Sequence, residues 1–278
     1  MMPPCRVEQR RSPRRAFTLI EMLVAVTIAA LMVVMMANLT NQTATVSKRA
    51  NNTLLALNAA SAALDLLVTD LDSLAAVRGS SEFLQASPDA VDTVNSTRLY
   101  LLALSPTDVT NADQAGQARA VLYRVAKQNP LGSGSGNQVY GLYRTALSAN
   151  TTFSDVIGLS DLSGYAWSAS PVRDDFLVGN VAQFRVLFYA AGNSSVTNPA
   201  PINLTSSSYQ SVRIAGNNVK LNGANYTTST PATAEISLTI LEESGALLFR
   251  NGSIPIDRAL REFGHTLTRR VTLRQPLF

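Results

Sequence analysis

The sequence predicts an α+β fold, in which a long N-terminal α-helix, half transmembrane and half amphipathic, packs on an antiparallel β-rich C-terminal domain. Two observations carry this prediction. No proline or glycine lies between Pro13 and Gly79, which suits one uninterrupted helix. Beyond Gly79, apolar and polar residues alternate in short runs separated by turn-forming residues, as in half-buried strands.

The first part of the predicted helix, residues 17–38, is long and apolar enough to cross a membrane. Glu21 is the only charged residue from 17 to 37, and about twenty residues rising ~1.5 Å each span the roughly 30 Å hydrocarbon core. An ionisable group in such a segment is costly and rare, so Glu21 is a candidate functional residue. Arginines precede the segment, and the positive-inside rule therefore keeps the N-terminus in the cytoplasm and sends the rest of the chain outward. These five arginines are Arg6, Arg10, Arg11, Arg14 and Arg15.

The second part, residues 39–78, is expected to continue the helix with one apolar face packed on the domain. The apolar side chains at helical spacing are Leu54, Leu57, Leu64, Leu67, Val68, Leu71 and Leu74. The positions between them that are predicted to face water are Asp65, Asp70, Asp72 and Arg78. Gly79 is the expected C-cap, because glycine readily adopts the left-handed conformation that ends many helices.

Residues 79–278 are expected to form the β-rich domain. Runs of alternating polarity have the period of two residues that is typical of strands. They cover 99–104, 119–125, 138–144, 181–189, 233–241 and 265–274. The run 181–189 is the clearest, because its phenylalanines and a valine fall on one face. A short helix is expected at 257–263, and the Asn/Ser/Thr-rich segments 192–211 and 222–230 are expected to be surface loops.

Residues 14–21 read Arg-Arg-Ala-Phe-Thr-Leu-Ile-Glu and resemble the prepilin signature of type IV pilins and type II secretion pseudopilins. That signature has a basic leader, a small residue, and then a Phe-Thr-Leu-Ile-Glu-like start to an apolar helix. The resemblance implies that residues 1–16 are a leader, that prepilin peptidase cuts between Ala16 and Phe17, and that the new amine is methylated. The family usually has glycine where this chain has Ala16, and cleavage is still expected because alanine is also small.

Glu21 can be given a physical role beside this resemblance. The freed α-amine of Phe17 is largely cationic at neutral pH. A carboxylate and an ammonium group are each very costly when buried alone, and pairing removes most of that cost. Glu21 of an incoming subunit is therefore expected to pair with the Phe17 amine of a neighbour at one axial offset, and so to set the register of a filament.

Three other interpretations of the N-terminus compete with a prepilin. A Sec signal peptide has a shorter apolar region, no internal acid and an A-x-A-like site after it, which does not fit residues 17–38. A twin-arginine signal fits the R-R-x-F pattern at 14–17, but Glu21 and the long apolar run argue against it. A plain signal anchor with Glu21 near the membrane interface is the third. We favour the prepilin.

The basic excess of the chain lies in the predicted leader. The whole sequence has 23 basic and 19 acidic residues, and removing the five arginines and Glu8 leaves 18 of each. The mature chain is therefore formally neutral, and no nucleic-acid partner is predicted. Cys5, the only cysteine, is removed too, so the exported part can form no internal disulfide. The roughly 200 residues after the helix are enough for one domain core.

Other catalytic and metal-binding patterns are weak. His265 is the only histidine, and a structural role in its strand is favoured over a catalytic one. A glycine-serine run lacks the lysine of a P-loop. The pairs Asp155/Asp161 and Asp174/Asp175 lack EF-hand spacing and are interpreted as solvated loop acids. No enzymatic activity, cofactor or metal is expected.

A second resemblance covers the strands. The runs 181–186 and 234–239, and the basic last strand near Arg269 and Arg270, are similar to those of J-type minor pseudopilins. The large size also favours a minor subunit over a major one. This resemblance implies contacts with other minor subunits through the long helices.

The resemblances together imply a structural subunit that assembles through its N-terminal helix into a type IV pilus-like or type II secretion filament, at or near the tip. Its partners would be prepilin peptidase, other pilin or pseudopilin subunits and an inner-membrane assembly platform. Before assembly it would be a single-pass protein of the bacterial inner membrane with a cytoplasmic N-terminus and a periplasmic domain. The competing hypothesis is a membrane-anchored periplasmic binding or hydrolytic ectodomain with an uncleaved signal anchor.

Overall fold

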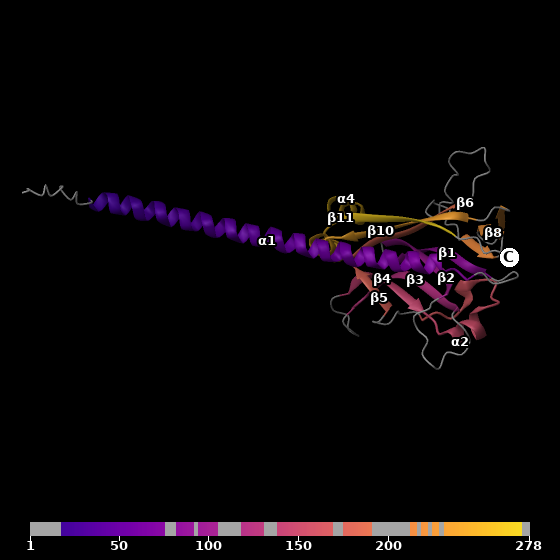
Figure 1. Cartoon of the computed structure of the whole chain (residues 1–278). Helices are drawn as coiled ribbons and strands as arrows, with labels where there is room; N and C mark the ends of the chain where they lie inside the picture. Colours follow the sequence, from indigo (N-terminus) through magenta and orange to yellow (C-terminus); the bar gives the residue numbers. More distant parts are fainter. Residues whose placement is uncertain are drawn as a thin grey trace, which may run out of the picture. The chain divides into compact units, whose positions relative to one another are not determined.

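The computed structural model describes residues 18–75, 82–91, 94–104, 118–130, 138–168, 175–190, 212–215, 218–221, 224–227 and 231–273. The chain divides into two compact units, Met1–Asn51 and Asn52–Phe278. The predicted α+β fold is confirmed, because one long helix is followed by a β-rich domain (Figure 1).

Helix α1 runs without interruption over Leu19–Asp72. It contains a stretch that is long and apolar enough to cross a membrane, and every residue from 18 to 51 is exposed. Threonine hydroxyls in this stretch donate to backbone carbonyls of the same helix, as Thr27 does to Val24 at 2.8 Å and Thr40 to Met36 at 2.8 Å. These threonine hydroxyls are thus satisfied within the helix.

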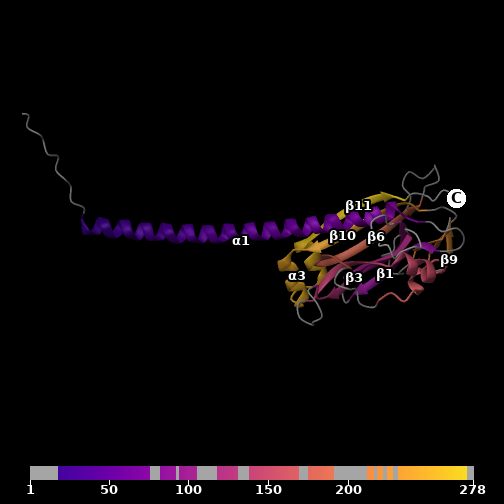
Figure 2. The same cartoon turned by 60° about the horizontal axis from the view of Figure 1, so that its bottom comes forward.

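Within the second unit, residues 52–72 of α1 lie along the sheet (Figure 2). One face of this part is buried at 0–2% exposure, through Ala60, Ala63, Leu64, Leu67 and Leu71. Burying each leucine stabilises the fold by about 1.5–3 kcal/mol relative to leaving it in water. The predicted apolar stripe is confirmed at Leu64, Leu67 and Leu71, which pack on the domain, but it is wrong at Leu54, which is 59% exposed.

Helix α1 ends at Asp72, before the Arg78 expected as its last residue. The chain there turns into the sheet, beside strand β2 (Val94–Leu104). The Ala75 amide donates to the Leu102 carbonyl at 2.8 Å. The helix therefore ends where the backbone begins to form hydrogen bonds with strand β2, and not at a glycine cap.

Asp70 is buried with 5% of its surface exposed, so the prediction that it faces water is wrong. Tyr123 donates its hydroxyl to Asp70 Oδ2 at 2.5 Å. Arg144 donates from Nε and Nη2 to the two carboxylate oxygens at 2.8 and 3.1 Å. Burial raises the pKa of the Tyr123 phenol, and the adjacent Asp70 carboxylate raises it further. This two-pronged ion pair offsets the cost of burying the charge and joins α1 to two strands.

Eleven strands form one sheet in the described part of the second unit. Their bounds are β1 Glu82–Val91, β2 Val94–Leu104, β3 Ala118–Gln128, β4 Val139–Ala146, β5 Phe176–Gly179, β6 Val181–Ala190, β7 Val212–Ala215, β8 Asn218–Leu221, β9 Ala224–Thr227, β10 Pro231–Leu241 and β11 Gly264–Thr272. The order is β11-β10-β6-β2-β1-β7-β8-β9, while β3 pairs with β2 and β4, and β5 with β4. Paired strands are antiparallel except β2 and β6, which meet at Ser96 and Phe184. The sheet therefore divides into two branches at β2.

The hydrophobic core joins α1 to both branches of the sheet. Phe184, Val186 and Phe188 of β6 are all 0% exposed, as the alternation of this strand predicts. They belong to the same buried cluster as Leu67 of α1 and Tyr123 of β3. Since the described core brings together residues from most of the chain after Asn52, it stabilises the second unit as one domain.

The six predicted strands are confirmed as β2, β3, β4, β6, β10 and β11, and the predicted helix 257–263 is α4 (Ile256–Phe263). The predicted loop 222–230 is wrong in part, because β9 pairs there with β8. The predicted loop 192–211 lies outside the described residues. Strand β1 escapes prediction because Pro88 interrupts its pattern. β7 pairs only with residues 82–86 of β1, so the proline lies where β1 has a single neighbour.

Helical turns interrupt the strands at two places. After β4 come the short turns α2 (Ala149–Thr151), η1 (Thr152–Val156) and η2 (Leu162–Gly164). Between β10 and β11, helices α3 (Glu243–Arg250) and α4 pack on each other. Gly245 of α3 is required for this contact, because a Cβ at its position would overlap the Phe263 side chain.

Candidate functional site

The start of α1 holds Glu21, the candidate residue of the sequence analysis, in a reciprocal cap. The Thr18 amide and hydroxyl donate to Glu21 Oε2 at 2.9 and 3.0 Å, and the Glu21 amide donates to Thr18 Oγ1 at 3.3 Å. Thr18 is the residue before the helix and Glu21 its third residue, which is the arrangement of a capping box. The Glu21 carboxylate and the Thr18 hydroxyl therefore each satisfy one backbone N–H at the positive end of the helix.

Thr18 is the capping partner of Glu21 that the sequence analysis missed. Its signal is present, since threonine followed three residues later by glutamate before an apolar run is a recognisable capping pattern. The other predicted site residues, Ala16, Phe17 and the five leader arginines, lie outside the described residues. The predicted cleavage and methylation of Phe17 therefore stay predictions.

Glu21 is surrounded by exposed apolar side chains. Leu19, Ile20, Met22 and Leu23 are 58–84% exposed. Within the described part of the chain, Glu21 is hydrogen-bonded only to Thr18. A carboxylate in such an apolar surrounding is costly without a cationic partner. Glu21 can therefore pair with a positively charged group. The apolar residues around it do not supply one.

Three exposed leucines lie on α1 within the second unit. Leu54 and Leu55 are each 59% exposed, and Leu66 is 36% exposed. Leu66 directly precedes the fully buried Leu67 in sequence, so it lies to one side of the buried face of the helix. At about 1.5 Å per residue, roughly 20 Å of helix separates Leu39, near the end of the apolar segment, from Leu54.

His265 and Asp161, two other candidates from the sequence, each contact charged residues of the same domain. His265 Nε2 lies 3.2 Å from Glu242 Oε1. Asp161 caps the turn at Ser163 and pairs with Arg213, and Asp155 is exposed nearby in sequence. Among the described residues no three His, Cys, Asp or Glu side chains gather in a way that could hold a metal ion. Asp174 lies outside the described residues.

Comparison with known proteins supports the importance of the N-terminal segment. Residues 11–37 match the family model of the prokaryotic N-terminal methylation motif. No curated protein matches the chain. Among solved structures, the chain is similar to a type IV-like pilin from Thermus thermophilus, with 13% sequence identity over 79% of this chain and 96% of that one and a TM-score of 0.38. The chain thus carries the methylation motif of type IV pilin N-termini, and its apolar helix is consistent with membrane anchoring.

Proposed function

We propose that this chain is a minor pilin or pseudopilin subunit that assembles through α1 into a type IV pilus-like or type II secretion filament, at or near the tip. The single observation that carries the proposal is the methylation motif over residues 11–37. In this proposal the peptidase site lies directly before a helix whose only charge in its membrane segment is Glu21. Such a subunit performs no catalysis of its own.

The motif defines the order of events in this proposal. The chain inserts into the bacterial inner membrane with its N-terminus in the cytoplasm and its domain in the periplasm. Prepilin peptidase cuts between Ala16 and Phe17 and methylates the new amine, and an inner-membrane platform passes the subunit to the filament. Glu21 then pairs with the Phe17 amine of a neighbour, because both charges leave water together.

The exposed leucines of the second unit favour a filament subunit over a simple anchored ectodomain. A lipid bilayer with a roughly 30 Å core covers about twenty helical residues. Leu54, Leu55 and Leu66 lie beyond that length along α1, so lipid does not cover them when residues 17–38 span the membrane. Neighbouring helices of a filament would cover these side chains. An anchored ectodomain gives no reason for exposed leucines there.

The finer assignment to a J-type minor pseudopilin has weaker support. The strands β6 and β10 and the basic last strand β11 have the pattern expected of that type, and the chain is large for a major subunit. In this assignment α1 contacts the helices of other minor subunits near the filament tip. The methylation motif alone does not distinguish this type from other pilin-like subunits.

Mass spectrometry of the mature N-terminus tests the proposal. A chain that begins with N-methylated Phe17 supports assembly, and an intact leader or a cut beyond Ala37 contradicts it. Deletion of the peptidase provides the control, since processing must then stop. An intact leader in the presence of the peptidase would favour the membrane-anchored ectodomain.

A further inference from the structure

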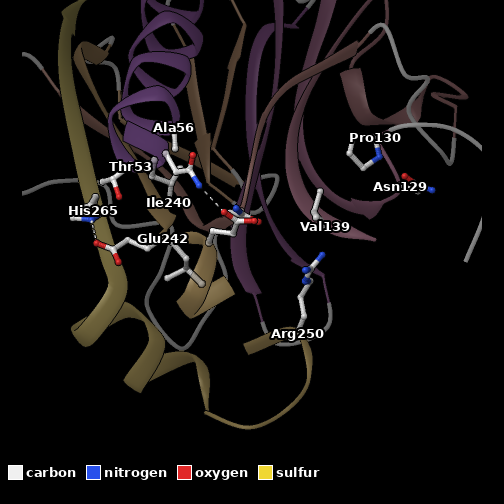
Figure 3. Close-up of a pocket in the computed structure, with 13 residues that line it drawn as sticks. Thr53, Ala56, Asn129, Pro130, Val139, Ile240, Glu242, Arg250 and His265 are labelled. Carbon is white, nitrogen blue, oxygen red and sulfur yellow. Dashed lines mark hydrogen bonds and ion pairs between the residues drawn. The ribbon is translucent and has the colours of Figure 1, made fainter. Parts of the chain in front are cut away.

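A pocket of about 410 Å³ lies in the second unit, a size common among ligand sites. It is formed by α1, the facing ends of β3 and β4, the turn between β5 and β6, the junction of β10 with α3, and the start of β11. In Figure 3, Glu242 and His265 lie on one side of the pocket and Arg250 and Asn129 on the other. Residues from six parts of the sequence thus converge on one cavity.

The charged groups of this pocket are not equally neutralised. Glu242 lies 3.2 Å from His265 Nε2, and Arg250 donates from Nη1 to the Gln138 carbonyl at 3.2 Å. Among the described residues, Arg250 and Glu243 thus each have only a neutral partner, since the Glu243 carboxylate accepts its hydrogen bond from the side-chain amide of Asn52 at 2.9 Å. The pocket therefore contains a solvent-accessible carboxylate that is fixed in position and has no described cationic partner.

The position of Glu243 in the first turn of α3 explains part of this arrangement. A negative charge is favourable at the N-terminus of a helix. That effect does not account for the contact with Asn52, which comes from α1, far away in sequence. Because Asn52 and Glu243 both line the pocket, their hydrogen bond holds the carboxylate at the pocket instead of leaving it free in solvent.

The rest of the lining suits a ligand with an apolar stem and a polar end. Ala56, Val139 and Ile240 supply apolar surface, and Asn180 supplies an amide. Arginine side chains have this form, since their methylene stem packs on apolar surface while the guanidinium group donates several hydrogen bonds. A guanidinium group also pairs with a carboxylate through two parallel hydrogen bonds.

We propose that this pocket binds an arginine side chain on a peptide segment of a partner protein, with Glu243 as the carboxylate that pairs with the guanidinium group. The apolar lining contacts the methylene stem, and Asn52 keeps Glu243 oriented. That the partner is another subunit of the filament rests on the proposed function, whereas the chemistry of the pocket does not.

Isothermal titration calorimetry on the purified full chain in detergent tests this proposal. The probes are the peptide acetyl-Gly-Arg-Gly-amide and its citrulline analogue, which has nearly the same shape and no charge. We expect saturable binding of the arginine peptide, and at least about tenfold weaker binding of the citrulline peptide, as the loss of a charge-assisted hydrogen bond implies. Glu243→Gln should weaken binding of the arginine peptide by a similar factor.

Glu262→Gln is the matched control, because Glu262 is an exposed glutamate of α4 that pairs with Arg258 outside the pocket. It should leave peptide binding unchanged. The absence of saturable binding, equal binding of both peptides, or equal binding by the Glu243→Gln chain would each overturn the proposal. Since these measurements need neither cleavage nor assembly, their failure is distinct from an unprocessed N-terminus, which would overturn the proposed function instead.

Discussion

The two units of this chain bury their apolar side chains in different ways. Residues 18–51 are exposed throughout and include an apolar segment of membrane length, which is consistent with lipid around it. Residues 52–278 bury a core of their own, to which residues 52–72 of α1 contribute. The first part of α1 is therefore exposed, whereas its second part packs into the core of the second unit. The change occurs near Asn52. Mutations on the two sides of that point should separate assembly from folding.

Substitution of Glu21 by valine should have the largest effect, a complete loss of incorporation into filaments. The variant removes the only charge of the apolar segment, so it should still insert and be cleaved. Mass spectrometry measures cleavage, and co-purification with partner subunits measures incorporation. Thr27→Val is a control in the same segment, because the Thr27 hydroxyl bonds only within its helix. Unchanged co-assembly of Glu21→Val would show that Glu21 does not set register.

Asp70→Ala should destabilise the second unit by about 3–5 kcal/mol, because it leaves Arg144 partly buried and unpaired. The free energy of unfolding can be measured by chemical denaturation, followed through the fluorescence of Trp167, the only tryptophan. Asp72→Ala, two residues along the same helix and exposed, should change stability by less than about 0.5 kcal/mol. Similar effects of the two variants would contradict the role given to the buried ion pair.

Leu67 and Leu66 are adjacent in α1 and should respond in opposite ways. Leu67 is fully buried, so Leu67→Ala should cost about 2–5 kcal/mol of unfolding free energy. Leu66 is 36% exposed, so Leu66→Ala should cost much less but reduce incorporation into filaments. The same denaturation and co-purification experiments measure both effects. A Leu66 variant that assembles normally would argue against a partner on this face.

Gly245→Ala should destabilise the second unit by about 1–3 kcal/mol, since the added methyl group overlaps Phe263 and forces α3 and α4 apart. Gly164→Ala is the control, because nothing lies within 4 Å of a Cβ at that position. Thermal unfolding of both variants measures the difference. Cleavage at the N-terminus should be unaffected, because the two units differ in what stabilises them.

The smallest effect concerns pH. Burial acts to raise the pKa of Asp161, but hydrogen bonds from Ser163 and the charge of Arg213 outweigh it and hold the pKa below its ordinary value. The Asp161 carboxylate therefore binds a proton less readily in the folded state than in the unfolded state. Its contribution to the free energy of unfolding is present above the unfolded pKa of about 3.9 and is lost as the pH falls through the pKa of the folded state. Asp161→Asn should flatten the decline of stability below about pH 4. Asp155→Asn, at an exposed residue, is the control.

The regular spacing of apolar residues predicted the helix and those strands that have one buried face. The alternation of β6 and of β10 follows from one buried and one exposed face, and the leucine spacing of α1 follows from one packed face. Strand β1 could not be predicted in this way, because Pro88 breaks its pattern and only the position of β7 makes the proline acceptable. The early end of α1 at Asp72 likewise depends on pairing with β2, which is distant in sequence.

Part of the candidate site could likewise be predicted from the sequence. Glu21 is evident from its place in an apolar segment, and Thr18 could have been found from its spacing to Glu21. The partner of Glu243 could not, because Asn52 and Glu243 are separated by 191 positions in sequence. No periodicity relates residues so far apart.

The sequence by itself determined the membrane-length helix, the acid within it and the methylation motif that overlaps its start, because each depends only on residues that follow one another along one segment of the chain. The tertiary structure decided that Asp70 is buried, that Leu66 is exposed beside buried Leu67, and that six separate segments form a pocket. The physical reason is that burial and charge pairing depend on which distant side chains meet, and only the packed sheet brings Arg144 to Asp70.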